Sequence, residues 1–201
     1  MQTGGLQAAV DAVSQAHPAA GLTLWAEDEH RLGLLPVVRR VWAPRGHRPT
    51  AWVHRRSQWL YVYAFVRPVT GQSWWCLLPT VGAEAMTLAL AAFAADEGID
   101  AAHRAVLVLA GAGWHTAGAL VVPDGVDLVF LPPASPELQP AERVWSLLDE
   151  SVANRTFADL AELTDVLIAR CTTRRAARRV VKAHTRFHWW AKERRPRRDH
   201  H

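Results

Sequence analysis

The sequence predicts an α/β protein built on a mixed five-stranded sheet with helices on both faces. Two short apolar runs, at residues 106–109 and 126–131, are each ended by Gly or Pro, which is typical of strands covered on both sides. Residues 57–66 are rich in aromatic and β-branched side chains, which favours a further strand. A helical pattern at 82–98 separates these strands, so we expect helices to pack against the sheet.

The first part of the chain predicts hairpin-linked strands. An Ala-rich, weakly helical lead at 1–21 precedes an apolar run at 22–26, which we expect to be the first strand. Within 37–53, two prolines and a glycine mark a turn between two strands. A turn after the aromatic strand leads into another strand at 73–78. This section therefore predicts three antiparallel strands with hairpin connections.

The second part predicts strands followed by helices. The stretch 105–122 is expected to form a strand, a turn and a short helix. Thr156 is followed three residues later by Asp159, a pattern typical of a capping box at a helix start. We expect the helix after it to cover one face of the sheet with a periodic apolar set: Leu160, Leu163, Val166, Leu167 and Cys171.

Acidic residues stand where chemistry is expected. Asp28 follows the strand at 22–26, and because alternate strand residues face opposite sides, it can point at a site while Glu27 and Glu29 point elsewhere. Prolines after 126–131 prevent regular pairing, and Glu142 then begins a helical pattern directed back at the sheet edge. Facing carboxylates of this kind can bind a divalent metal; a solvated acidic turn is the other interpretation of Asp28.

Three sequence words carry a family resemblance: L-W-A-E-D-E-H-R-L-G-L, V-L-V-L-A-G-A-G-W-H and L-P-P-A-S-P-E-L-Q-P-A-E-R-V-W. They resemble the signature blocks of DDE transposases of bacterial insertion sequences, in the mariner-like superfamily. The agreement covers roughly residues 22–191, and the W-x-x-x-G-x-x-P word at 42–49 adds to it. The resemblance implies a ribonuclease H-like fold in which the first and fourth strands lie side by side.

The resemblance also implies a two-metal site with one member missing. Asp28 would bridge two Mg²⁺ ions, with Mn²⁺ as a substitute, position 110 would hold one ion and Glu142 the other. Here Ala110 stands where the family carries its second catalytic aspartate. Cutting a phosphodiester and joining a 3′ hydroxyl need an activated attacking oxygen and a stabilised leaving oxygen, which two metals provide. Losing one member of such a unit costs on the order of 10³ to 10⁶ in rate, so we expect a nearly inactive chain.

Three explanations of Ala110 compete. In the first, it is an engineered substitution that keeps a DNA or metal complex uncleaved, and the intact neighbouring residues favour this explanation. Alternatively, it records natural decay or repurposing, which would leave a non-enzymatic DNA-binding remnant with a regulatory role. In the third explanation the alignment slips and Asp124 or Asp127 substitutes, but the first lies in a Pro-Asp-Gly turn and the second inside a strand.

Basic residues gather toward the end of the chain, which predicts contact with a polyanion. Interleaved Phe187, Trp189 and Trp190 favour a docking or DNA-contacting helix there, and a solvated, frayed tail is the alternative. His115 has two interpretations, as a contact to phosphate or a metal-bound water, or as a helix cap. The expected DNA contacts are Arg45, Arg48, His115, Arg174, Arg175, Arg178, Arg179, Lys182 and Arg186.

Composition sets the remaining expectations. Two distant cysteines without metal-ligand spacing and no visible signal peptide favour a reduced, cytoplasmic setting, here bacterial and nucleoid-associated. Glycines break the apolar stretch at 105–122, so we expect no membrane contact. The expected partners are double-stranded DNA at transposon ends and targets, a second copy in a homodimer, and a separate N-terminal helix-turn-helix region or chain. The expected divisions are a lead at 1–21, a catalytic domain at 22–173 and a basic C-terminal helix and tail at 174–201.

Overall fold

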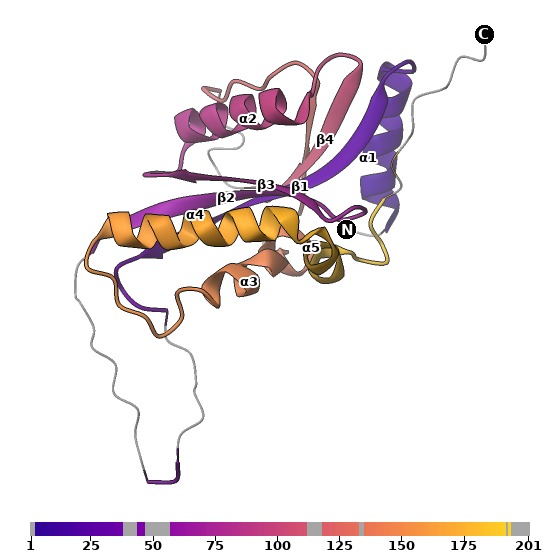
Figure 1. The fold of residues 1–201 in the computed structure, drawn as a ribbon. Coiled ribbons are helices and arrows are strands. Elements are labelled where there is room, and N and C mark those ends of the chain that lie inside the picture. The colour runs from indigo at the N-terminus through magenta and orange to yellow at the C-terminus, as the bar shows by residue number, and fades with distance from the viewer. Residues whose placement is uncertain are drawn as a thin grey trace.

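A mixed five-stranded sheet with helices on both faces forms the centre of the molecule (Figure 1), which confirms the predicted architecture. The computed structural model describes residues 3–37, 44–46, 57–111, 118–132, 135–191 and 193. The strands are β1 (Gly21–Gly33), β2 (Trp59–Arg67), β3 (Gln72–Leu78), β4 (His103–Leu109) and β5 (Val126–Phe130), in the spatial order β3-β2-β1-β4-β5.

Strand β1 is the central strand, and it is longer than predicted. It pairs in parallel with β4, so the first and fourth strands are neighbours as expected, and Glu27 lies opposite Leu109. On its other side it pairs antiparallel with β2 as far as Gly33 opposite Trp59. Because this pairing continues past the apolar run, the acidic residues lie inside the strand. The prediction that the strand ends at residue 26 was wrong.

Helix α2 (Ala83–Glu97) covers one face of the sheet. Its Phe93 ring stacks on Phe65 of β2 at 4.3 Å between centroids and meets Trp25 of β1 edge-on at 5.0 Å. The helix ends at Gly98, which adopts a left-handed conformation with φ of 65°. The predicted helix at 82–98 is therefore confirmed.

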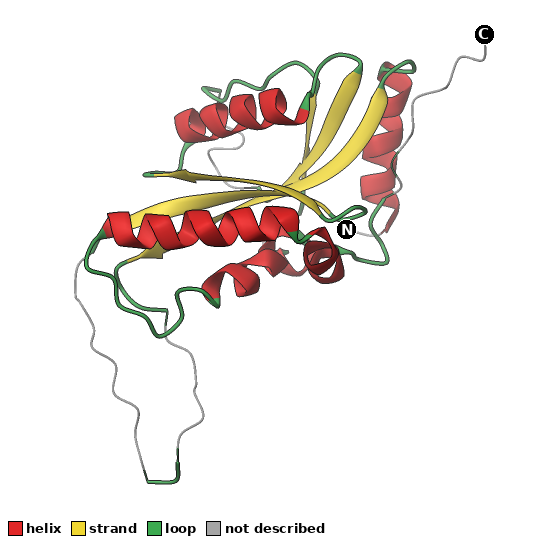
Figure 2. Ribbon diagram, in the orientation of Figure 1, coloured by secondary structure: helices red, strands yellow, loops and turns green. Residues whose placement is uncertain are grey.

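The other face carries the remaining helices (Figure 2). A second hydrophobic core lies between the sheet and these helices. It contains Leu24 and Ala26 of β1 together with Leu6 and Val10 of the N-terminal helix, so the lead packs against the sheet. Within the described part of the chain, no helix is long and apolar enough to cross a membrane. The helices are α1 (Thr3–Ala16), η2 (Pro136–Leu138), η3 (Ala141–Val144), α3 (Trp145–Asp149), α4 (Leu160–Ala176) and α5 (Arg178–Thr185).

Helix α4 begins later than the capping-box pattern predicts. The cap is Asp159, not Thr156, because the Asp159 side chain accepts a hydrogen bond of 2.9 Å from the Glu162 backbone N–H. The predicted apolar face is confirmed, since Leu163 and Leu167 are buried in the second core. This helix also runs through residue 173, where the boundary to a separate C-terminal part was expected.

The aromatic residues near the C-terminus pack against the second core and lie beyond the last helix, so the helix expected to carry them was a wrong prediction, while contact of this region with DNA stays a prediction. Helix α5 ends at Thr185, and Phe187 and Trp189 then stack on each other at 5.2 Å and pack against the second core. Glu193 accepts hydrogen bonds from Arg67 of β2 at 2.6 and 2.7 Å and from the Leu24 backbone N–H at 3.2 Å. These contacts tie this end of the described chain to the sheet.

Two predicted features fall largely outside the described residues. Of the hairpin expected within 37–53, only a turn around Arg45 and Gly46 is described beyond Val37. A short helix was expected within 105–122, and residues 112–117 of this stretch are also outside the described part.

Candidate active site

A cavity of about 150 Å³ lies where the end of β4 and the middle of β1 meet the 3₁₀ helix η3. Asp28 and Ala110 both line it, because each continues the alternation of its strand on the same face of the sheet. Asp28 follows Leu24 and Ala26, and Ala110 follows Val108; these three apolar side chains point into the second core. A side chain at position 110 therefore lines the same cavity as Asp28, on the same face of the sheet.

Glu142 reaches this cavity from η3. Buried Ala141 and Val144 anchor η3 on the second core, and the Gln139 side-chain amide donates a 2.8 Å hydrogen bond to the Glu27 carbonyl oxygen of β1. These contacts hold the start of the helix over the central strand. Asp28, Ala110 and Glu142, predicted as one site, are thus brought together from three separate parts of the chain.

The two carboxyl groups interact directly. Burial raises the pKa of Asp28 well above its ordinary value, and its hydrogen bond with Glu142 raises the pKa further. The Trp145 hydrogen bond acts in the opposite direction and lowers the pKa of Asp28. A raised pKa favours the protonated form of Asp28, and binding of a divalent cation would displace that proton.

Trp145 is a buried residue of the second core and also a site residue, which the predicted site does not include. Its indole Nε1–H donates a 2.7 Å hydrogen bond to Oδ2 of Asp28. The His30 ring stacks on the Trp145 ring at 4.9 Å between centroids, with 18° between the planes. Two spacings could have indicated this: Trp145 lies three residues after Glu142 on a helix, and His30 lies two residues after Asp28 on a strand.

The oxygen donors of the site suit a hard cation such as Mg²⁺ or Mn²⁺. Asp28 and Glu142 supply them, whereas position 110 supplies a methyl group. Among the described residues no group of three or more His, Cys, Asp or Glu side chains is placed to hold a metal. The site therefore offers two carboxylates where the resemblance implies three.

Asp124 and Asp127 do not substitute for the missing carboxylate. Both pair with Arg104, at 3.4 and 2.9 Å respectively, at the amino-terminal ends of β4 and β5. Asp127 lies opposite Val106, four residues before Ala110, which is about 13 Å along a strand. This geometry argues against a slipped alignment.

Glu27, the neighbour of Asp28, points to the opposite face of the sheet and is fully buried. Neither of its carboxyl oxygens has a hydrogen-bond partner among the described residues. Burial raises the pKa of Glu27 well above its ordinary value, and nearby Glu29 and Asp28 add to the rise. Burial thus favours the neutral form of Glu27, whose side chain lies outside the cavity.

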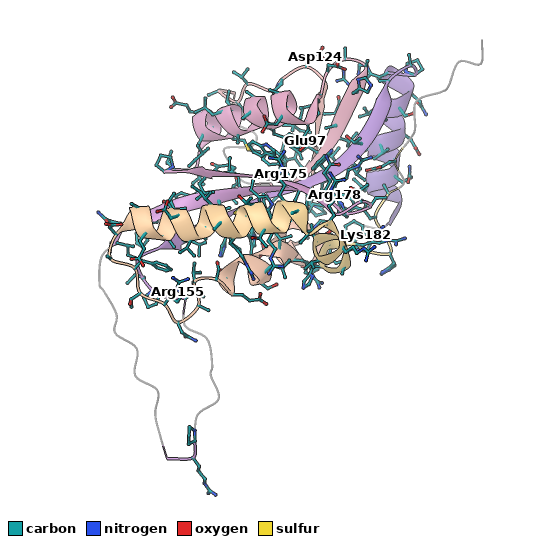
Figure 3. The ribbon with its side chains drawn as sticks, viewed as in Figure 1. Glu97, Asp124, Arg155, Arg175, Arg178 and Lys182 are labelled. Carbon is teal, nitrogen blue, oxygen red and sulfur yellow. The ribbon has the colours of Figure 1, made fainter. Side chains whose placement is uncertain are left out.

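The basic residues expected to contact DNA fall into two groups. Arg174 is largely buried and pairs with Glu150 at 3.5 Å, while Arg175 pairs with Glu97 at 3.6 Å. Figure 3 shows Arg175 and Glu97 near the end of α4. Both cations are thus already neutralised in part.

The second group is available to solvent. Arg178, Arg179 and Arg186 are exposed at the ends of α5, and Lys182 is half-buried on it. Arg45 is exposed on its turn. Arg48 and His115, the other two expected contacts, lie outside the described residues.

Comparison with known proteins matches residues 23–164 to the family described as DDE superfamily endonuclease. A protein of Sinorhizobium fredii (strain NBRC 101917 / NGR234), named uncharacterized protein y4pE/y4sA, is 41% identical over 106 residues, which is 52% of this chain and 77% of that protein.

Solved structures of Mos1 transposase share the fold. The paired-end complex with the left transposon end has a TM-score of 0.53 and 14% identity over 90% of this chain. The Mos1 mariner paired-end complexes with Mn and with Mg both have TM-scores of 0.55, at 14% and 15% identity over 90% and 91% of this chain. The chain spans 60–62% of the length of these Mos1 chains. The sheet and its helices thus have the ribonuclease H-like arrangement.

Proposed function

The chain belongs to the DDE superfamily of endonucleases, and we propose that it is the catalytic domain of a transposase that cuts and joins DNA at transposon ends. One observation carries the proposal: Asp28, Ala110 and Glu142 line a single cavity although they are far apart in the sequence. The DNA in the Mos1 paired-end complex is in keeping with this activity.

Asp28 and Glu142 would hold divalent metal, Mg²⁺ with Mn²⁺ as a substitute, and position 110 would complete a two-metal site. The donor chemistry fits, since both groups are carboxyls in contact with each other in a small cavity. When bound, the two ions activate the attacking oxygen and stabilise the leaving oxygen of phosphoryl transfer.

The protein's own residues orient these ligands. Asp28 is held by the pairing of β1 with β2 and, at the preceding residue, with β4, and the Trp145 indole donates a hydrogen bond to one of its oxygens. Glu142 is held by the buried anchors of η3. With alanine at 110 one anionic ligand is lost, so we propose that this chain is catalytically silent, at a cost on the order of 10³ to 10⁶ in rate.

A second candidate is a non-enzymatic DNA-binding remnant with a regulatory role. The observation that favours it is that exposed Arg178, Arg179 and Arg186 remain available while the carboxylate at 110 is missing. In either role the proposed partners are double-stranded DNA, a second copy of the chain and a separate helix-turn-helix region. A bacterial nucleoid setting follows from these partners.

Restoring the carboxylate tests the proposal. Cleavage and joining of a labelled transposon-end duplex with Mg²⁺ or Mn²⁺ are compared for the chain, Ala110→Asp, and Ala110→Asp combined with Glu142→Ala. The end-recognition region is supplied in trans or fused. Ala110→Asn, which has the same shape without the charge, is the matched control.

We expect activity only in Ala110→Asp, and we expect Glu142→Ala to remove it again. DNA binding that persists while Ala110→Asp stays silent would favour the remnant. DNA binding that weakens steeply with salt, in the unchanged chain and in Ala110→Asp, would support phosphate contacts by the exposed arginines.

A further inference from the structure

Two side-chain contacts, Asp28 with Trp145 and His30 with Asp149, connect strand β1 to helix α3 beside the carboxylate pair. Asp28 and His30 lie two residues apart on one face of β1, and Trp145 and Asp149 lie four residues apart on one face of α3. Trp145 donates to Asp28 at 2.7 Å, and His30 Nε2 lies 3.0 Å from Asp149 Oδ1. The His30 and Trp145 rings stack on each other and so link the two contacts.

We propose that Trp145, held in place by His30 and Asp149, is a positioning residue that fixes the Asp28 carboxylate for metal binding. The inference rests on the proposed function of Asp28 and Glu142. An indole has one N–H donor with a fixed direction, so a ring that cannot turn also fixes the oxygen it engages. Trp145 is 5% exposed and cannot turn without losing its stack on His30.

The position of the contact explains why it would matter for metal. Glu142 and Trp145 belong to the same continuous helical segment, η3 followed by α3. The two side-chain contacts therefore fix this segment against the strand that carries Asp28, and the distance between the two carboxyl groups depends on them. Contacts of this kind around metal ligands typically change metal affinity by about 10- to 100-fold when removed.

A purely structural role for Trp145 is the competing explanation, and a neighbouring tryptophan provides the control. Trp75 meets Trp145 edge-on at 6.1 Å, and its indole N–H bonds to Ser73 at 2.9 Å and not to a carboxylate. Trp145→Phe and Trp75→Phe therefore both remove an indole from the same aromatic group. Only the first removes a donor to Asp28.

The experiment measures Mn²⁺ binding by electron paramagnetic resonance, in the chain and in Ala110→Asp, with thermal unfolding as a check on folding. We expect Trp145→Phe to raise the Mn²⁺ Kd by about 10-fold or more, and Trp75→Phe to change it by less than about twofold. His30→Ala should weaken binding in the same direction and add little to Trp145→Phe, because both act through one ring. Replacing Trp145 by benzothienylalanine removes the N–H alone, and it is used if Trp145→Phe does not fold.

The outcomes separate this inference from the proposed function. If Ala110→Asp binds Mn²⁺ and Trp145→Phe or its benzothienyl equivalent leaves the Kd unchanged, Trp145 has no positioning role. An equal loss in Trp75→Phe also overturns the inference, because it would reflect packing alone. If neither the chain nor Ala110→Asp binds Mn²⁺, the metal site itself is wrong and the inference falls with it.

Discussion

Glu27 allows a quantitative test of the electrostatics of the central strand. Its carboxyl group is fully buried without a hydrogen-bond partner among the described residues, and burial raises its pKa. At a pH above the ordinary value of 4.5, the unfolded chain has lost this proton while the folded chain keeps it. The folded state then binds more protons, so the free energy of unfolding falls as the pH rises.

The magnitude follows from linkage. One extra proton in the folded state gives a limiting slope of about 1.4 kcal/mol per pH unit. Glu27→Gln is neutral in both states and lacks this slope. Between pH 5.5 and 6.5 the variant should therefore gain about 1.3 kcal/mol of unfolding free energy relative to the unchanged chain. Asp28 is present in both proteins, so its own titration largely cancels in the difference.

Urea unfolding followed by tryptophan fluorescence at the two pH values measures this difference. Glu84→Gln removes the same charge from an exposed position on α2, so it measures the contribution of net charge alone. The Glu27 effect is the excess over that control. An excess below ~0.3 kcal/mol, well under the linkage value, would show that Glu27 finds a partner or water in solution and would refute the reasoning.

Two further predictions concern contacts distant from the site. Asp127→Ala leaves the buried Arg104 guanidinium with only the exposed Asp124, so urea unfolding should show a loss of about 3 kcal/mol, and Asp124→Ala a much smaller one. Gly71→Ala should lower the free energy of unfolding by about 2 kcal/mol or more, because Gly71 has φ of 75° and an added Cβ would lie 1.9 Å from the first carbonyl oxygen of α5. Gly98→Ala, at φ of 65° with open space around it, isolates the conformational cost, and an equal loss in both variants would contradict the steric argument.

The sheet could be predicted because its strands are covered on both faces and therefore appear as apolar runs. The length of β1 could not, since Glu27, Asp28 and Glu29 look like a solvated turn. What extends the strand is the distant pairing with β2 up to Gly33, and pairing of that range leaves no local pattern.

The position of the C-terminal aromatic residues could not be predicted for a similar reason. Phe187 and Trp189 among cations are typical both of a nucleic-acid surface and of a segment that folds back on a core. The structure selects the second, because Arg143 of η3 lies over the Phe187 ring at 5.0 Å and both rings pack against the second core. A cation beside an aromatic residue in the sequence does not reveal which partner it meets.

The site was predictable to the extent that it depends on neighbouring parallel strands. Asp28 and Ala110 converge because β1 and β4 pair in parallel with Glu27 opposite Leu109, and Glu142 joins them because a helix follows the next strand. The contact of Trp145 with Asp28 depends instead on how α3 crosses β1, which the sequence pattern does not specify. This is why the predicted site does not include Trp145.

The alanine at 110 leaves the arrangement of the site intact, because elements outside the carboxylates determine it. The backbone at 110 is set by β4, whose Val108 and Leu109 are fully buried, and the helical segment carrying Glu142 is held by Val144 and by Trp145. A third carboxylate in a small cavity would repel the other two, since like charges in a poorly solvated site disfavour ionisation. The fold therefore does not need an aspartate at 110, and only a bound cation would make one favourable.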